Sequence, residues 1–233
     1  MDESLVDFLG NTLLFSGLPR ENLVFLSSLA TEKTYGKGEL IFSEGDEASG
    51  FYIVKAGLVR IYKISINGRE QTLHLLGQGE PFGEVAVFIG MDYPAYAMAL
   101  DHSEVLFFPK DRFVTAIRRH PELALAMLAV LSRRLRAFSR MIEDLSLKEV
   151  PQRLAAYLTA LSEFDDRDLL KREITLHVSK NLLSTILGTS PETISRVFKK
   201  LEERGILERK NERIFLKDLE KLHDLADGIT KLA

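Results

Sequence analysis

The apolar and polar positions along the chain follow two different patterns, which meet near residue 112. In the first pattern, glycines separate short apolar runs, which is typical of short strands joined by tight turns. The runs lie at 40–42, 51–54, 58–62, 71–76 and 104–108. Asn67-Gly68 between two of these runs predicts a two-residue hairpin turn. Many short strands at such close spacing predict an antiparallel β jelly roll of about a hundred residues.

From residue 113 onward the apolar positions change to alternating spacings of three and four, which form the a/d seam of a coiled coil. The seam consists of Leu128, Leu131, Leu135, Phe138, Ile142 and Leu145. Because this stripe is narrow, we predict that the helix pairs with the same helix of a second chain. The alternative is a helix packed on its own domain's core, which usually shows a wider stripe.

Two capped helices with a tight turn between them are predicted in the C-terminal third. Ser179 can cap a helix that ends at Gly188, where a turn needs a residue that tolerates positive φ. Ser190 can cap a second helix, with Pro191 at its first position. This pattern is typical of a helix-turn-helix, and two strands predicted within 206–216 would add a wing.

These patterns predict an α+β chain in three parts. The first part, over 1–112, is a sensor jelly roll with N-terminal helices. The second is a long coiled-coil dimerisation helix over 113–146. The third is a winged helix-turn-helix domain over 147–233.

Composition excludes several classes of protein. The chain has no cysteine, so disulfides, thiolate catalysis and cysteine-ligated iron–sulfur clusters are ruled out. No apolar run approaches the roughly eighteen residues that a membrane span needs, and the chain opens on Asp2 and Glu3. We therefore expect a cytoplasmic protein without a membrane partner.

Jelly rolls also build metal-dependent enzymes, but these need clustered histidines such as a His-x-His pair, which the sequence lacks. We expect no enzyme activity.

Charge is unevenly distributed along the chain. The net charge is −3, yet residues 172–217 hold ten bases and six acids, a local balance of +4. A locally basic region on an acidic body suits a protein that presents one face to DNA, whereas a merely solvated helix surface is the alternative.

The second helix of the pair exposes chemistry that can read bases. A carboxylate such as Glu192 can accept from cytosine N4, and an arginine such as Arg196 can donate twice to guanine. The alternative for these two residues is a surface ion pair at i, i+4 spacing. The predicted DNA contacts are Ser179, Lys180, Thr189, Ser190, Glu192, Thr193, Ser195, Arg196 and Lys199, with Lys210 and Arg213 at the tip of the wing.

In this order of parts, the chain resembles the Crp/Fnr family of bacterial transcription regulators between about residues 13 and 216. The motifs that carry the resemblance are the stretch 38–46, Tyr52-Ile53-Val54 with Gly57, Pro81-Phe82-Gly83-Glu84, and Glu192-Thr193-Ile194-Ser195-Arg196. The last motif is similar to the Fnr-type reader, whereas the cyclic-AMP receptor type usually has an arginine where this chain has Pro191. The resemblance implies a ligand- or redox-responsive homodimer that binds a palindromic operator in double-stranded DNA. RNA polymerase is a further implied partner if the protein is an activator.

The resemblance also bears on the effector. Gly83-Glu84 match the phosphate cassette of cyclic-AMP receptors, but Pro94-Ala95 stand where those proteins have Arg-Ser. Phe138 likewise replaces a threonine that reads adenine. A cyclic phosphate without its arginine would be desolvated and unpaired, so cyclic AMP is not the expected small-molecule effector. A cyclic-nucleotide regulator with an altered cassette is the alternative.

An apolar pocket between roll and dimer helix is then expected to hold the effector. Its predicted lining is Phe82, Gly83, Glu84, Val85, Met98, Met127, Leu131 and Phe138. Haem with nitric oxide, a small organic acid and an aromatic compound all suit such a pocket. Haem would need an axial donor, and neither His74 nor His102 is assigned that role, because a lone histidine in a roll is more often structural.

Overall fold

The computed structural model describes residues 3–164, 173–176, 178–210 and 213–232. The chain divides into two compact units, Met1–Arg136 and Ala137–Ala233, and each unit is built around its own buried side chains.

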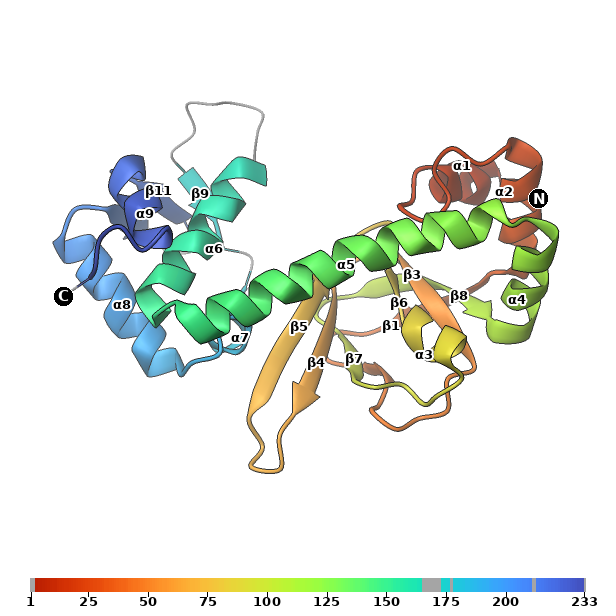
Figure 1. Ribbon diagram of the computed structural model, residues 1–233, viewed down its shortest axis with the longest axis horizontal. Helices are drawn as coiled ribbons and strands as arrows, with labels where there is room; N and C mark the ends of the chain where they lie inside the picture. The colour runs from red at the N-terminus through yellow and green to blue at the C-terminus, as the bar shows by residue number, and fades with distance from the viewer. Residues whose placement is uncertain (1–2, 165–172, 177, 211–212, 233) are drawn as a thin grey trace. The chain divides into compact units, whose positions relative to one another are not determined.

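Two four-stranded antiparallel sheets form the roll of the first unit (Figure 1). One sheet has the order β1-β8-β3-β6 and the other the order β2-β7-β4-β5. The strands are β1 (Thr31–Tyr35), β2 (Leu40–Phe42), β3 (Gly50–Ala56), β4 (Val59–Ile64), β5 (Glu70–Leu76), β6 (Pro81–Phe82), β7 (Tyr96–Ala99) and β8 (Ser103–Pro109). The predicted antiparallel jelly roll is confirmed.

Aromatic rings join the two sheets. Phe42 stacks on Tyr93 with ring centroids 3.8 Å apart, and Tyr52 stacks on Phe82 at 5.0 Å. Phe42 of one sheet lies 5.8 Å from Tyr52 of the other. Offset ring pairs of this kind add to the free energy gained by burying the rings, so the roll is closed from inside by its aromatic side chains.

Helices cover the other face of β3 and β8. They are α1 (Glu3–Gly10), α2 (Arg20–Leu29), α4 (Lys110–Arg119) and the start of α5 (Glu122–Leu147), while the short α3 (Glu84–Ile89) follows β6. Phe51, Phe108 and Phe113 are fully buried in this second core. Leu123 and Met127 of α5 belong to the same core, which explains why the division between the units falls inside α5 and not before it.

The helix predicted over 113–146 is in fact two helices. α4 ends at Arg119 and α5 begins at Glu122, because Pro121 lacks the backbone N–H that a continuous helix would need. Among the described residues no helix is long and apolar enough to cross a membrane.

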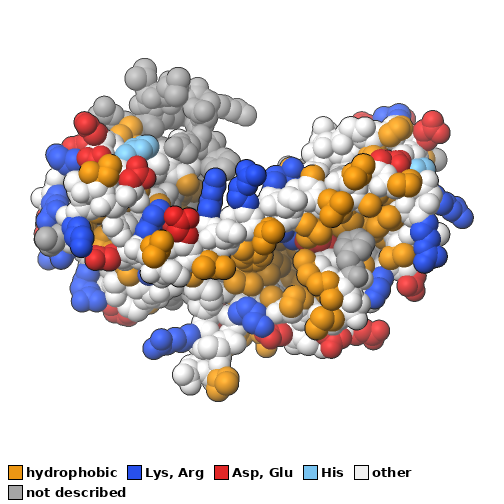
Figure 2. Space-filling model, viewed as in Figure 1, with side chains coloured by type: hydrophobic (Ala, Val, Ile, Leu, Met, Phe, Trp, Pro, Cys, Tyr) orange, Lys and Arg blue, Asp and Glu red, His pale blue; other side chains and the backbone are white. Residues whose placement is uncertain are grey.

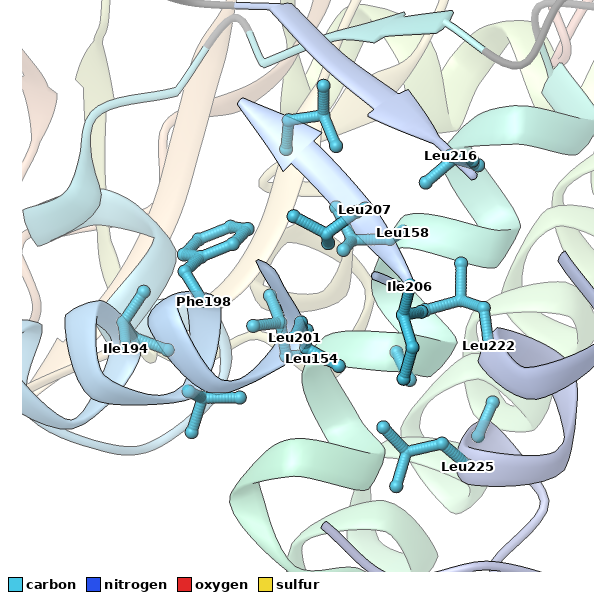
Figure 3. Close-up of a cluster of buried hydrophobic side chains, with 14 of the residues drawn as sticks. Leu154, Leu158, Ile194, Phe198, Leu201, Ile206, Leu207, Leu216, Leu222 and Leu225 are labelled. Atoms are coloured by element: carbon cyan, nitrogen blue, oxygen red, sulfur yellow. The ribbon is translucent and has the colours of Figure 1, made fainter. Parts of the chain in front are cut away.

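The second unit is packed around the second helix of the predicted helix-turn-helix pair. Its elements are α6 (Val150–Phe164), β9 (Glu173–Thr175), α7 (Lys180–Ile186), α8 (Pro191–Glu203), β10 (Leu207–Lys210), β11 (Arg213–Leu216) and α9 (Leu219–Ala226). The strands form an antiparallel sheet in the order β10-β11-β9. Figure 3 shows Phe198 and Leu201 of α8 in one cluster with Leu154 and Leu158 of α6. The predicted winged helix-turn-helix is confirmed, although the turn of the wing at 211–212 lies outside the described residues.

Gly57 allows the tight turn between β3 and β4. Its φ is +89°, and an added Cβ would meet the Ser103 side chain at 2.5 Å and the His102 carbonyl oxygen at 2.7 Å. Gly68, in the next turn, has a φ of +73° but no neighbour within 4 Å of such a Cβ. A side chain at either position would meet backbone strain, but only at Gly57 would it also meet a steric clash.

We expect Gly57→Ala to lower the free energy of unfolding of the roll by about 3 kcal/mol or more, since strain and a clash with backbone add together. Gly68→Ala should cost only the strain, about 1 to 2 kcal/mol. Urea denaturation followed by far-UV circular dichroism checks both, and equal losses would show that the Gly57 turn relaxes.

Candidate DNA-binding site

Both helices of the helix-turn-helix begin at the predicted serine caps. The Ser179 side chain accepts a hydrogen bond from the Leu182 backbone N–H at 3.2 Å, and the Ser190 side chain accepts one from the Thr193 N–H at 3.3 Å. Gly188 between the helices has a φ of +61°, as the predicted turn requires. The start of α8 is therefore fixed by its own sequence.

The turn brings α7 and α8 close together through a small side chain. Ser184 is 3% exposed, and its carbonyl oxygen accepts from the Thr189 backbone N–H at 2.9 Å. Arg153 of α6 donates to the Leu187 carbonyl oxygen at 3.0 Å and to the Lys148 carbonyl oxygen at 2.7 Å. These hydrogen bonds of Arg153 were not predicted from the sequence, because no local pattern links residue 153 to residue 187.

The predicted base-reading residues differ in how exposed their side chains are. Glu192, Arg196 and Lys199 are exposed on α8. Ser195 is half-buried, and its hydroxyl donates to the Pro191 carbonyl oxygen at 3.0 Å. The Ser195 hydroxyl proton is therefore used within the helix, and only its oxygen is left to accept a hydrogen bond.

Arg196 is oriented by a neighbour other than the expected one. Its Nη2 donates to Thr193 Oγ1 at 3.0 Å, and no ion pair joins it to Glu192, although both side chains are described. The Glu192 pKa is lowered, first by its own backbone N–H, then by the Ser190 hydroxyl and the Arg196 charge. Glu192 is thus an ionised hydrogen-bond acceptor, and Arg196 is a donor whose orientation Thr193 fixes.

The two predicted wing contacts are both paired with acids. Lys210 lies 3.0 Å from Glu208, and Arg213 lies 3.0 Å from Glu173. The Lys210 and Arg213 side chains are each 66% exposed, so these pairs are weak and a phosphate can compete for either cation.

Arg209 was counted among the bases, but it has a structural role. It forms two hydrogen bonds to Glu202, at 2.9 and 2.8 Å, and its guanidinium lies 4.6 Å from the centroid of the Phe198 ring. This pair joins α8 to the wing across the Gly205 turn. Lys200, by contrast, is exposed one turn beyond Arg196 and forms no ion pair with any described residue. The i, i+4 spacing from Arg196 could have identified Lys200.

In the roll, Glu84 is buried and already has a counter-charge. It is 1% exposed at the start of α3 and forms an ion pair with Arg134 of α5, which also donates to the Pro81 carbonyl oxygen. The other carboxylate oxygen of Glu84, Oε2, is buried and has no hydrogen-bond partner in the part of the chain that is described. The sequence analysis did not anticipate Arg134.

The structure separates several residues predicted to line one pocket. Phe82 packs in the aromatic cluster between the sheets, whereas Met127 packs with the helices on the far face of β3 and β8. Met98 alternates with the fully buried Ala97 and Ala99, so its side chain points away from the roll interior. Val85 is 38% exposed, Leu131 is half-buried, Gly83 has a φ of +78° at the start of α3, and Phe138 belongs to the second unit.

His74 is half-buried, and its Nε2 is shielded from water. Burial, with the nearby Arg134 charge, lowers its pKa from 6.5 to about 4. Among the described residues no three histidine or acidic side chains are close enough to hold a metal ion.

Family models and known proteins match both units. Residues 32–120 match the cyclic nucleotide-binding domain, and residues 152–225 match the Crp-like helix-turn-helix domain. The cyclic AMP receptor protein of Thermus thermophilus is 32% identical over 93% of this chain and 97% of its own length. The transcriptional activator protein FnrA of Stutzerimonas stutzeri is 32% identical over 82% of this chain and 79% of its own length. The structure of CLP, a c-di-GMP responsive global regulator of Xanthomonas campestris, superposes with a TM-score of 0.75 at 26% identity, covering 85% of this chain and 99% of that one.

Proposed function

Because the chain belongs to the Crp/Fnr family of transcription regulators, with an effector-binding domain and a helix-turn-helix DNA-binding domain, we propose that it acts as a cytoplasmic homodimer on a palindromic operator. Each protomer reads one half-site with α8, and RNA polymerase is the further partner where the protein activates. A small-molecule effector other than cyclic AMP controls binding. Members of this family regulate transcription, and the chain is accordingly not an enzyme.

The observation that carries the DNA-reading proposal is the Arg196 side chain. It is exposed, it has no acidic partner within ion-pair distance among the described residues, and Thr193 fixes its orientation. A guanidinium held in this way can donate twice to guanine in the major groove with little loss of side-chain freedom. Pro191 stands where the cyclic-AMP receptor type has an arginine, which supports a half-site of the Fnr kind.

The homodimer proposal rests on apolar side chains that α5 leaves in water. Leu128, Leu135 and Ile142 are 59%, 69% and 66% exposed, and Leu145 is 38% exposed. Figure 2 shows apolar side chains gathered along α5 and on the roll surface beside it. Monomeric proteins rarely expose large apolar patches, and the three-four spacing of these residues matches the seam of a parallel helix pair.

Cyclic AMP is a poor fit to the cassette. Ala95 is buried, and the Pro94 carbonyl oxygen accepts from Lys63 Nζ at 3.0 Å. That lysine is also paired with Glu44, and Arg134 at the cassette is paired with Glu84, so both cations are already neutralised. A cyclic phosphate would therefore lose its hydration without gaining a counter-charge. A cyclic-nucleotide regulator with an altered cassette is the second candidate, supported by the retained Gly83 and Glu84.

Haem with nitric oxide is a further candidate for the effector. Its support is the half-buried imidazole of His74, whose lowered pKa keeps it neutral, as an iron ligand needs to be. The nearby Arg134 charge works against it, because iron would add positive charge at the same place. A small organic ligand that donates a hydrogen bond to the buried Glu84 Oε2 meets no such conflict.

We expect Arg196→Ala to weaken binding to an operator, selected by the wild-type protein from random palindromic duplexes, by about 1 to 3 kcal/mol. One position of each half-site should lose its base preference. Lys199→Ala should lower the affinity for the operator and for a scrambled duplex alike, because it removes a phosphate contact. Fluorescence anisotropy measures both, and an unchanged ratio of operator to scrambled affinity in Arg196→Ala would contradict the assignment.

Leu135→Glu should convert the dimer to a monomer, because it would place two carboxylates in the apolar seam. The residue is 69% exposed in a single chain, so the protomer itself should still fold. Ile66→Glu, at a fully exposed position in the β4–β5 turn, is the matched control and should leave the dimer intact. Sedimentation velocity distinguishes the two states, and a wild-type monomer at micromolar concentration would refute the dimer.

Calorimetry with cyclic AMP and cyclic GMP should show no binding at micromolar concentrations. Micromolar affinity for either nucleotide would instead establish the altered-cassette alternative. An absorption spectrum of protein purified with and without added haem then separates the other candidates. A Soret band that shifts with nitric oxide indicates haem, and a featureless spectrum indicates a small organic effector.

A further inference from the structure

We propose that a hollow beside the recognition helix binds a small organic anion with an apolar body, such as an aromatic carboxylate, and that the bound anion competes with DNA. The hollow has a volume of about 490 Å³ and lies wholly within the second unit. The start of α6 and the middle of α8 form two of its walls, and Leu232 forms the third. The competition with DNA, but not the anion site itself, rests on the proposed function.

The floor of the hollow is apolar. Val150 and Pro151 of α6, Val197 of α8 and Leu232 supply it, and Val197 is only 6% exposed. Leu232 is held in place by its neighbours, since the Lys231 carbonyl oxygen accepts from Arg204 at 3.1 Å. A volume of this size, with apolar walls and a few polar groups, lies within the range of small-molecule sites.

The rim of the hollow is cationic. Arg196 and Lys200 line it, one helical turn apart on α8. In the part of the chain that the structure describes, neither has an acidic partner within ion-pair distance. Arg153 lines it as well, although two of its donors are used by backbone carbonyl oxygens. Glu149 is the single acid among the lining residues, and it lies 4.0 Å from Lys231. The excess of positive charge over an apolar floor favours an anion that also has an apolar body.

The hollow suits a small ligand better than the DNA backbone. Phosphates of a duplex are strongly hydrated, and an apolar floor would remove that water without replacing its hydrogen bonds. A planar carboxylate can instead take two N–H donors of Arg196 while its ring covers Val197 and Pro151. Arg196 is also the proposed base reader, and a guanidinium engaged by a carboxylate is no longer available to guanine.

The test uses the full-length protein with 1-naphthylacetate as the probe and its neutral analogue 1-naphthylacetamide as the charge control. Lys200→Gln removes a rim cation at an exposed position, so folding should not change. Lys221→Gln is the matched variant, because it removes the same charge from the same unit at a residue of α9 that does not line the hollow. Calorimetry measures probe affinity in each protein.

We expect wild-type protein to bind the acid at least fivefold more tightly than the amide. Lys200→Gln should lower the affinity for the acid at least fivefold, whereas Lys221→Gln should change this affinity less than twofold. The proposal is overturned if the acid gives no binding heat at millimolar concentration, or if acid and amide bind equally. Equal affinity in Lys200→Gln and wild type would also overturn it, because the probe would then occupy another site.

Anisotropy with the selected operator tests the competition separately. Naphthylacetate should raise the apparent operator Kd of wild type linearly with its concentration, by the factor one plus that concentration divided by its own Kd, and this effect should be smaller in Lys200→Gln. If the acid binds as expected but no palindromic duplex binds, the operator proposal fails while the anion site stands. If operator and acid bind together without mutual effect, the competition is refuted.

Discussion

Burial of one face of α8 is the constraint on which the second unit depends. Ile194, Phe198 and Leu201 are at most 1% exposed, and each contributes about 1.5 to 3 kcal/mol by leaving water. α6 and the wing pack against these side chains, and Arg209 with Glu202 holds the wing to the helix. Since a helix with one face buried cannot rotate, its opposite face is fixed. The exposed position of Arg196 is therefore a consequence of the core, and Thr193 then orients its guanidinium.

The parts of this site that could be predicted from the sequence depend on neighbours in the chain. Ser190 caps α8 through an N–H three residues on, and Gly188 supplies the positive φ of the turn. Such contacts are set by spacing alone, so a single sequence reveals them. The directions of individual side chains are different. Ser195 was expected to face DNA, but a hydroxyl on a helix can equally bond the carbonyl four residues back, and here it bonds Pro191.

Contacts between distant segments escaped the sequence analysis for a physical reason. Arg134 and Glu84 lie fifty positions apart, and only the packing of α3 against α5 brings them together. The face on which Met98 lies could not be told from the sequence, because the strand's alternation could be read in either register until Ala97 and Ala99 proved to be the buried pair. The overall order of roll, helix and winged domain needed no such information, since it follows from the change of apolar period.

The ion pair between Glu84 and Arg134 also limits how an effector can act. A buried carboxylate needs its counter-charge, so a ligand that removes Arg134 must itself bring a cation, whereas a ligand that leaves the pair intact can only bond the remaining Oε2. Arg134 is adjacent to Leu135 in the apolar seam of α5. In the proposed function, the effector site and the dimer seam therefore use neighbouring positions of one helix, so an effector that shifts this helix can act on pairing without reaching the DNA-binding unit.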